Sequence, residues 1–182
     1  MTFAIVVDTC IARAAGTRSG DVTALLCCDV LDNIKTNGHS LAMSKLLYDE
    51  WMKNKSGVGG HHKTYASRYA ITWFADMQTR GRVKWYALDI DKELRPVVTC
   101  AAVPETRRAI EKDLHVLETA LEADKRVMSI ERRLPNHLRQ LCAHVPQIHE
   151  ILWLNPNVHS AVQWLTNGAQ DIGEFRLCQD GV

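Results

Sequence analysis

The chain has 182 residues, of which 46% are hydrophobic and 24% charged, and its formal net charge is +1. This composition is typical of one globular domain and argues against a disordered or fibrous chain. The nearly balanced charge excludes a bulk polycation, so any affinity for nucleic acid must come from local basic patches. No apolar run reaches the roughly 18 residues that a membrane helix needs, and the N-terminus lacks a signal-peptide pattern. We therefore expect a cytoplasmic protein without a membrane segment.

The predicted elements alternate between strands and helices along almost the whole chain. Short apolar runs bounded by turn residues indicate strands at 4–7, 41–43, 82–88, 96–102, 125–130 and 149–156. Apolar residues at helical spacing indicate helices at about 22–37, 45–55, 63–81, 105–123, 134–144 and 159–169. This alternation predicts an α/β domain with a mainly parallel central sheet. The Gly-rich stretch 56–62, which contains His61 and His62, is predicted to be a mobile loop.

Capping residues mark where three of these helices begin. Ser19 or Asp21 precedes the first helix and Ser44 precedes the second, and both residue types accept hydrogen bonds from free N–H groups at a helix start. Pro104 is suited to the first turn of the long helix, where a missing N–H costs nothing. In the first helix, a stripe with a spacing of four is predicted to face the core: Val22, Leu26, Val30 and Ile34.

Four carboxylates occupy positions where apolar or partnered residues are expected. Asp8 and Glu131 each follow an apolar strand at its carboxyl end, while Glu50 and Asp113 lie on or beside the apolar faces of their helices. A carboxylate in such a place is costly unless it is paired or bound to a metal. Any one of them alone can be a capping residue or the partner of an arginine. Clustered at the carboxyl ends of parallel strands, they would suit Mg²⁺ or Mn²⁺ rather than zinc.

Three segments in order, "VVDT", "SKLLYDEW" and "KDLHVLETALEADKRVMSIERR", resemble the PIN-domain family of metal-dependent nucleases over about residues 1–135. The resemblance implies a three-layer α/β/α fold and a catalytic, metal-binding set made of Asp8, Glu50, Asp113 and Glu131. It also implies substrate-binding roles for Thr9, Ser129 and Arg132. The fourth acid of the family is usually aspartate, so Glu131 departs from the pattern, and its longer side chain can shift or weaken a second metal site.

The resemblance further implies an endoribonuclease that hydrolyses RNA with Mg²⁺ or Mn²⁺, as a toxin or a defence nuclease. An antitoxin or other protein partner follows from the toxin role, and whether the chain forms a homodimer stays open. Residues 136–182 are read as a C-terminal strand–helix extension that packs on the nuclease core. Two other classes remain open: a catalytically weak PIN-like module that binds RNA or protein, and a different α/β enzyme, such as a phosphatase or a receiver-like domain.

Other candidate residues are assigned to structure. The six cysteines follow no disulfide or CxxC spacing and are predicted to be buried thiols in a reducing compartment. His115 falls off the apolar stripe of the long helix and is predicted to be exposed. Trp73 and Phe74 are predicted to belong to the core rather than to a surface that stacks on bases.

Overall fold

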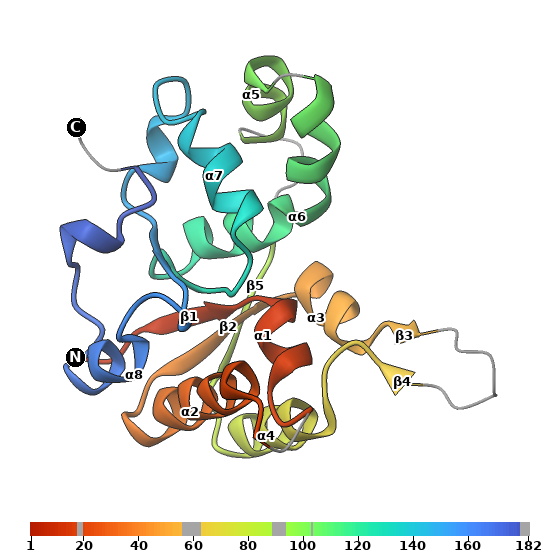
Figure 1. The fold of residues 1–182 in the computed structure, drawn as a ribbon, viewed down its shortest axis with the longest axis vertical. Coiled ribbons are helices and arrows are strands. Elements are labelled where there is room, and N and C mark those ends of the chain that lie inside the picture. The colour runs from red at the N-terminus through yellow and green to blue at the C-terminus, as the bar shows by residue number, and fades with distance from the viewer. Residues whose placement is uncertain (18–19, 56–62, 89–93, 103, 179–182) are drawn as a thin grey trace.

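A computed structural model of the chain describes residues 1–17, 20–55, 63–88, 94–102 and 104–178. Within these ranges, five parallel strands form the central sheet in the order β5-β2-β1-β6-β7 (Figure 1). The strands are β1 (Ala4–Val7), β2 (Ser40–Ser44), β5 (Val83–Tyr86), β6 (Arg126–Met128) and β7 (Leu152–Leu154). The predicted α/β class with a mainly parallel sheet is thus confirmed.

The central strand β1 is apolar throughout because both of its faces are covered. Its four residues, AIVV, are all buried, as expected for a parallel strand with helices on both sides. In the register, Val6 lies opposite Ala42 of β2 on one side and Val127 of β6 on the other. The chain runs from β1 outward through β2 to β5 and then crosses back to β6. The order of the strands therefore reverses between β1 and β6, where open α/β sheets bind ligands.

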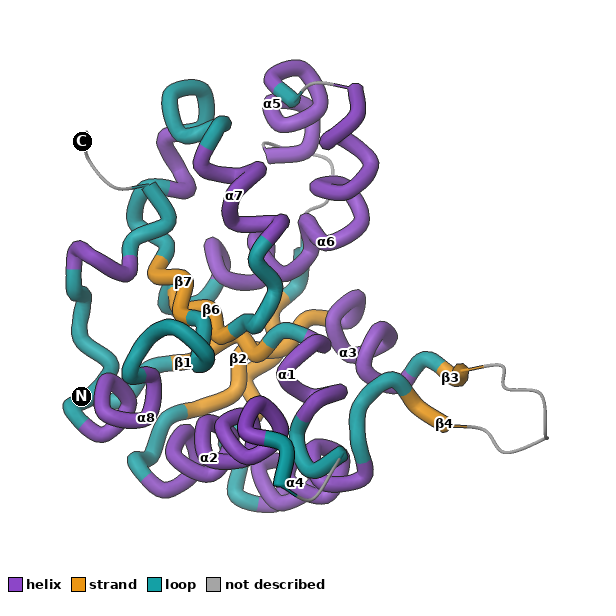
Figure 2. The backbone as a smooth tube through the Cα atoms, in the orientation of Figure 1, coloured by secondary structure: helices purple, strands orange, loops and turns teal. Residues whose placement is uncertain are grey.

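Helices cover both faces of the sheet (Figure 1). They are α1 (Thr9–Ala14), α2 (Val22–Thr36), α3 (Lys45–Met52), α4 (Arg68–Thr79), α5 (Leu94–Ala101), α6 (Pro104–Glu122), α7 (Arg133–Arg139) and α8 (Ala161–Thr166). The helices α2, α4 and α8 lie on one side, and α5, α6 and α7 lie on the other. A short hairpin of β3 (Asn54–Lys55) and β4 (Lys63–Thr64) projects from the body in Figure 2. The predicted loop 56–62 lies outside the described residues.

Three helices begin where the sequence predicts. Asp21 accepts hydrogen bonds from the backbone N–H groups of Thr23 and Ala24 at the start of α2. Ser44 accepts one from Leu47 at 3.3 Å at the start of α3, and Pro104 begins α6. These caps satisfy N–H groups that have no partner within the helix. The predicted stripe of α2 is wrong at its first position, because Val22 is 69% exposed.

The predicted strand 96–102 is instead the helix α5. Its valine-rich sequence suggested a strand, but Pro96 is the third residue of the helix, where a proline is tolerated. Leu94 and Val98 are buried against α6, and Arg95 forms a bidentate ion pair with Glu118 of α6 at 2.7 and 3.0 Å. This packing is a long-range effect that local β-propensity does not report. The helix α1, which follows β1 directly, was not expected either.

The prediction that all six cysteines are buried thiols is wrong. Cys142, after α7, and Cys178, near the C-terminus, form a disulfide across 36 residues, and Cys100 is exposed. The C-terminal segment runs beside β7, where the N–H of Leu177 donates to the carbonyl of Ile151. That return of the chain brings the two sulfurs together, and cysteine spacing alone cannot show it. Cys27 does fit the prediction, because it is a fully buried thiol. Burial raises its pKa to about 12.

Residues 136–182 supply the edge strand β7 to the same sheet as β1, and α8 packs against α2. Within the described ranges, no helix combines the length and apolar character that crossing a bilayer demands.

A buried histidine links the backbone just before β1 to α8. The imidazole of His39 is fully buried, accepts a hydrogen bond from the N–H of Phe3 at 3.1 Å through Nδ1, and lies 3.2 Å from the carbonyl of Leu165 through Nε2. These partners require the neutral ring with its proton on Nε2, because a protonated Nδ1 could not accept. Burial lowers the pKa of His39, and the nearby Arg126 guanidinium adds to this.

We expect this arrangement to make the fold sensitive to acid. A depressed folded-state pKa gives stability that is fully present above the ordinary histidine pKa of about 6.5 and is lost as the pH falls through the folded-state value. The free energy of unfolding of the wild type should therefore decrease below about pH 6.5, by at most about 1.4 kcal/mol per pH unit for this one proton. Urea unfolding between pH 8 and 5 measures the slope. The variant His39→Asn should show a shallower slope, and equal slopes would contradict the assignment.

Candidate functional site

Two residues that follow neighbouring strands meet at the point where the strand order reverses. Asp8 comes directly after β1 and caps the short helix α1, and Ser129 comes directly after β6. The N–H of Asp8 donates to the carbonyl of Met128 at 3.0 Å, which fixes the two strand ends side by side. Both side chains are therefore placed at the carboxyl edge of the sheet by the backbone alone.

The carboxylate of Asp8 accepts hydrogen bonds from two neighbouring side chains on the same oxygen. Ser129 donates to its Oδ2 at 2.5 Å, and the thiol of Cys10 donates to the same oxygen at 3.0 Å. The other oxygen, Oδ1, accepts only a long bond from the N–H of Cys10, at 3.4 Å, within the described residues. Burial nevertheless raises the pKa of Asp8 above its ordinary value, opposed by these bonds and reinforced by the charge of Glu50. The surroundings of Asp8 thus disfavour its ionised form.

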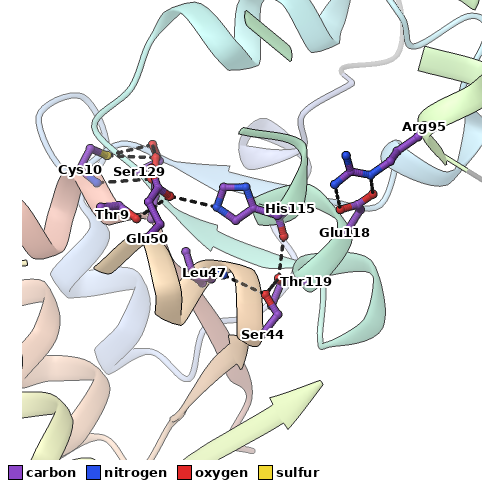
Figure 3. Close-up of polar contacts among 11 residues, drawn as sticks. Thr9, Cys10, Ser44, Leu47, Glu50, Arg95, His115, Glu118, Thr119 and Ser129 are labelled. Atoms are coloured by element: carbon purple, nitrogen blue, oxygen red, sulfur yellow. Dashed lines mark hydrogen bonds and ion pairs between the residues drawn. The ribbon is translucent and has the colours of Figure 1, made fainter. Parts of the chain in front are cut away.

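Glu50 reaches the same region from α3. Its Oε2 accepts a hydrogen bond from the hydroxyl of Thr9 at 2.8 Å and one from Nε2 of His115 at 3.0 Å (Figure 3). Burial acts to raise the pKa of Glu50, but the bonds from His115 and Thr9 outweigh it, so the pKa is lowered. Glu50 is therefore held ionised. Asp49, which the sequence places further round the helix, is exposed and pairs with Lys45 at 2.5 Å.

The third acid, Asp113, lies on α6. Burial raises the pKa of Asp113, and the negative charges of Asp8 and Glu50 raise it further, although Lys112 opposes them. The charges of the three carboxylates thus act on one another. Like charges brought together in a partly buried place disfavour one another's ionised forms.

His115 belongs to the contacts of the candidate site, and sequence reasoning missed it. The prediction that it is exposed is wrong, because only 7% of its surface is exposed. The helix α6 buries a wider face than its leucine stripe suggests, since it packs on the sheet, on α3 and on α7. Burial acts to lower the pKa of His115, but the bond to Glu50 and the charges of Glu50, Asp113 and Asp8 raise it.

A second set of contacts joins α6 to the start of α3. The hydroxyl of Thr119, one turn further along α6, lies 2.6 Å from the carbonyl of His115 and 2.8 Å from the hydroxyl of Ser44 (Figure 3). Ser44 in turn caps α3 through the N–H of Leu47. Thr119 and Ser44 are both fully buried. This chain of polar contacts sets the distance between α6 and α3, and it therefore brings the imidazole to Glu50.

Glu131 lies apart from the contacts that join the other acids. Its Oε1 accepts hydrogen bonds from the backbone N–H groups of Arg132 and Arg133, at 2.9 and 2.7 Å, at the start of α7. Its own N–H donates to the hydroxyl of Ser129 at 3.0 Å. The backbone of Glu131 therefore supports the residue that binds Asp8, while its carboxylate caps a helix.

The predicted substrate-binding residues have different surroundings. Thr9 and Ser129 are buried, and their hydroxyls are used by Glu50 and Asp8, respectively. The arrangement makes them supports of the carboxylates in this structure. Arg132 is exposed at the edge of the same region. Trp73 and Phe74 are buried in the core, as predicted.

The oxygen ligands are of the type that a hard divalent cation binds, but within the described ranges they are not grouped as a metal site would require. Carboxylate oxygens with like charges and partial burial are the ligands that Mg²⁺ and Mn²⁺ prefer. Among the described residues, however, no three His, Cys, Asp or Glu side chains are grouped closely enough to hold a metal ion. Oε2 of Glu50 is engaged by Thr9 and His115. Oε1 of Glu50 carries neither of these bonds, and Oδ1 of Asp8 accepts only the long bond from Cys10 among the described residues. These are the oxygens through which the two acids could bind a cation.

Comparison with protein families, with curated proteins and with solved structures gave no match in any of the three.

Proposed function

We propose that this protein is a PIN-type, Mg²⁺- or Mn²⁺-dependent endoribonuclease whose metal is held by Asp8, Glu50 and Asp113. The observation that carries the proposal is the convergence of three acids where the strand order reverses. Glu50 accepts from Thr9, the residue after Asp8, and from His115, which lies on α6 with Asp113. Burial and neighbouring charge raise the pKa values of Asp8 and Asp113. Partly buried carboxylates with raised pKa values are typical of functional sites. A divalent cation would offset the repulsion among these like charges.

A metal bound there would supply a Lewis acid and a water of lowered pKa for attack on a phosphodiester. The chain's own residues hold and orient the ligands. Ser129 and Cys10 hold one oxygen of Asp8, and Thr9 holds one oxygen of Glu50. The imidazole of His115 donates to that same oxygen of Glu50 and meets its charge.

RNA is the proposed substrate class. Exposed cations lie on the elements that carry the acids: Lys112 and Arg108 on α6, and Arg132 and Arg133 at the start of α7. Lys112 acts on the charges of both Glu50 and Asp113. Such groups bind a phosphate backbone without reading its sequence. A cytoplasmic toxin or defence role, with an antitoxin partner, belongs to the same proposal, as does a nuclease core over 1–135.

A catalytically weak module that binds RNA or protein is the second candidate, and two observations favour it. No three-ligand metal group exists among the described residues, and the Glu50–His115 pair already balances one of the charges. Under this alternative, the acids would be a remnant of a metal site. The two candidates differ in one outcome, which is divalent-dependent cleavage.

The test is cleavage of a fluorescent single-stranded RNA by purified protein with Mn²⁺, with Mg²⁺ and with EDTA. We expect cleavage with either metal and none with the chelator. Glu50→Gln should greatly reduce the rate, whereas Asp49→Asn, one residue away on the exposed face of α3, should leave it unchanged. Binding of RNA without cleavage under all metal conditions would instead support the binding module.

Replacement of Glu131 should have a milder effect than loss of a metal ligand. Because its carboxylate caps α7 through the N–H groups of Arg132 and Arg133, Glu131→Gln keeps an acceptor for those groups. We expect a cleavage rate within about 10-fold of wild type, since a ligand that acts through water leaves the central ion in place. Single-turnover rates across a Mn²⁺ titration measure this. A loss as large as that of Glu50→Gln would place Glu131 among the direct ligands.

A further inference from the structure

Cys10 lies at the centre of the contacts between the two strand ends. Its thiol donates to Oδ2 of Asp8 at 3.0 Å, and its sulfur accepts from the N–H of Ile130 at 3.3 Å. The hydroxyl of Ser129 lies 3.3 Å from the same sulfur. One side chain from the first turn of α1 thus contacts both the acid after β1 and the loop after β6. Figure 3 shows Cys10 beside Ser129.

Counting hydrogens fixes the direction of these bonds. Ser129 has a single hydroxyl hydrogen, which it donates to Oδ2 of Asp8, and Cys10 has a single thiol hydrogen, which it donates to the same atom. Each of these two atoms also accepts one bond, since the N–H of Glu131 donates to Ser129 and that of Ile130 donates to Cys10. Oδ2 is therefore held by two donors, each of which accepts a hydrogen bond from a backbone N–H group. Oδ1 keeps only its long contact to the N–H of Cys10.

We propose that Cys10 is a positioning residue that, together with Ser129, turns the carboxylate of Asp8 so that Oδ1 faces the divalent cation. This inference rests on the proposed function and names a residue that the family resemblance does not include. Residues that hydrogen-bond to a metal ligand fix its orientation, and their loss typically weakens metal affinity. Because the sulfur also accepts from the loop after β6, Cys10 keeps that loop beside Asp8 whether or not metal is bound.

The geometry of the thiol suits this role. Its hydrogen is donated to Oδ2 of Asp8, and its sulfur accepts the N–H of Ile130, so both contacts are made within the protein. A hydroxyl at this position would supply the same hydrogen, whereas a methyl group would supply none.

The test compares Mn²⁺ binding to the full chain and to three variants by isothermal titration calorimetry. Cys10→Ala should weaken Mn²⁺ affinity by roughly 10-fold or more, and Cys10→Ser should restore most of the loss because it keeps a donor. Cys28→Ala removes another partly buried thiol, on α2, and should bind as wild type. Far-ultraviolet circular dichroism confirms that each variant is folded before titration.

An infrared measurement reads the hydrogen bond independently of metal and of activity. The S–H stretching band of Cys10, obtained as the difference between wild type and Cys10→Ala, should lie at a lower frequency than a free thiol and should shift upward in Asp8→Asn. A band at the free-thiol frequency, or Mn²⁺ affinity of Cys10→Ala equal to wild type, would overturn the positioning role alone. No Mn²⁺ binding to the wild type would overturn the proposed function and this inference together, so the two failures are distinguishable.

Discussion

Asp8→Asn should abolish Mn²⁺-dependent RNA cleavage, with a loss of at least roughly 1,000-fold, or about 4 kcal/mol of transition-state stabilisation. Asparagine keeps the shape of the side chain and an acceptor for Ser129, but it removes the charge that would bind the cation. The same variant should be more stable than wild type without metal. Burial raises the pKa of Asp8, so at neutral pH the folded state carries a charge that it disfavours.

Two measurements on one variant therefore move in opposite directions. Single-turnover cleavage rates should fall, while the urea concentration at the unfolding midpoint in EDTA should rise. Asp29→Asn, an exposed acid on α2, is the control and should change neither quantity. Cleavage by Asp8→Asn at the wild-type rate would remove Asp8 from the metal site. Lower metal-free stability would mean that the bonds from Ser129 and Cys10 outweigh burial.

Trp51→Ala should be the most destabilising single change beside the site. The indole of Trp51 is fully buried on α3, next in sequence to Glu50, and its ring packs 6.2 Å from that of Phe74. Removing it leaves a cavity, which typically costs roughly 3–5 kcal/mol for tryptophan. Its Nε1 has no hydrogen-bond partner within the described part of the chain, so the loss is one of packing. Because α3 carries Glu50, metal affinity should weaken as well.

Thermal unfolding of Trp51→Ala measures this effect, with an expected decrease in Tm of roughly 6–20 °C at about 2–4 °C per kcal/mol. Trp85→Ala supplies a control with the same chemical change. Trp85 is 51% exposed on the edge strand β5, where it contacts Tyr48 edge-on at 5.5 Å. Its replacement should cost about 1 kcal/mol or less. Equal decreases in Tm for the two variants would contradict the description of α3 as anchored by Trp51.

Local signals in the sequence were sufficient for much of the fold. The apolar run at 4–7 and the alternation of strands and helices predicted the parallel sheet, and capping residues such as Ser44 marked helix starts. These features act over a few residues, so they can be read without tertiary structure. The placement of Asp8 at a strand end also follows from the sequence, because it needs only the strand boundary.

The features that the sequence did not predict depend on contacts between distant segments. The helix α5 forms where a strand was expected because Arg95 and its neighbours pack on α6. The burial of His115 follows from the approach of α3, and the Cys142–Cys178 disulfide follows from the return of the C-terminal segment. Local propensity contains no information about such neighbours.

Titration of Mn²⁺ into the metal-free wild type by isothermal titration calorimetry tests the central claim most directly. The claim is that Asp8, Glu50 and Asp113, which interact through their charges in this structure, form a divalent metal site. It predicts saturable binding of at least one ion to the wild type and no measurable binding to Asp8→Asn under the same conditions. Absence of binding to the wild type, or equal affinity in Asp8→Asn, would contradict it.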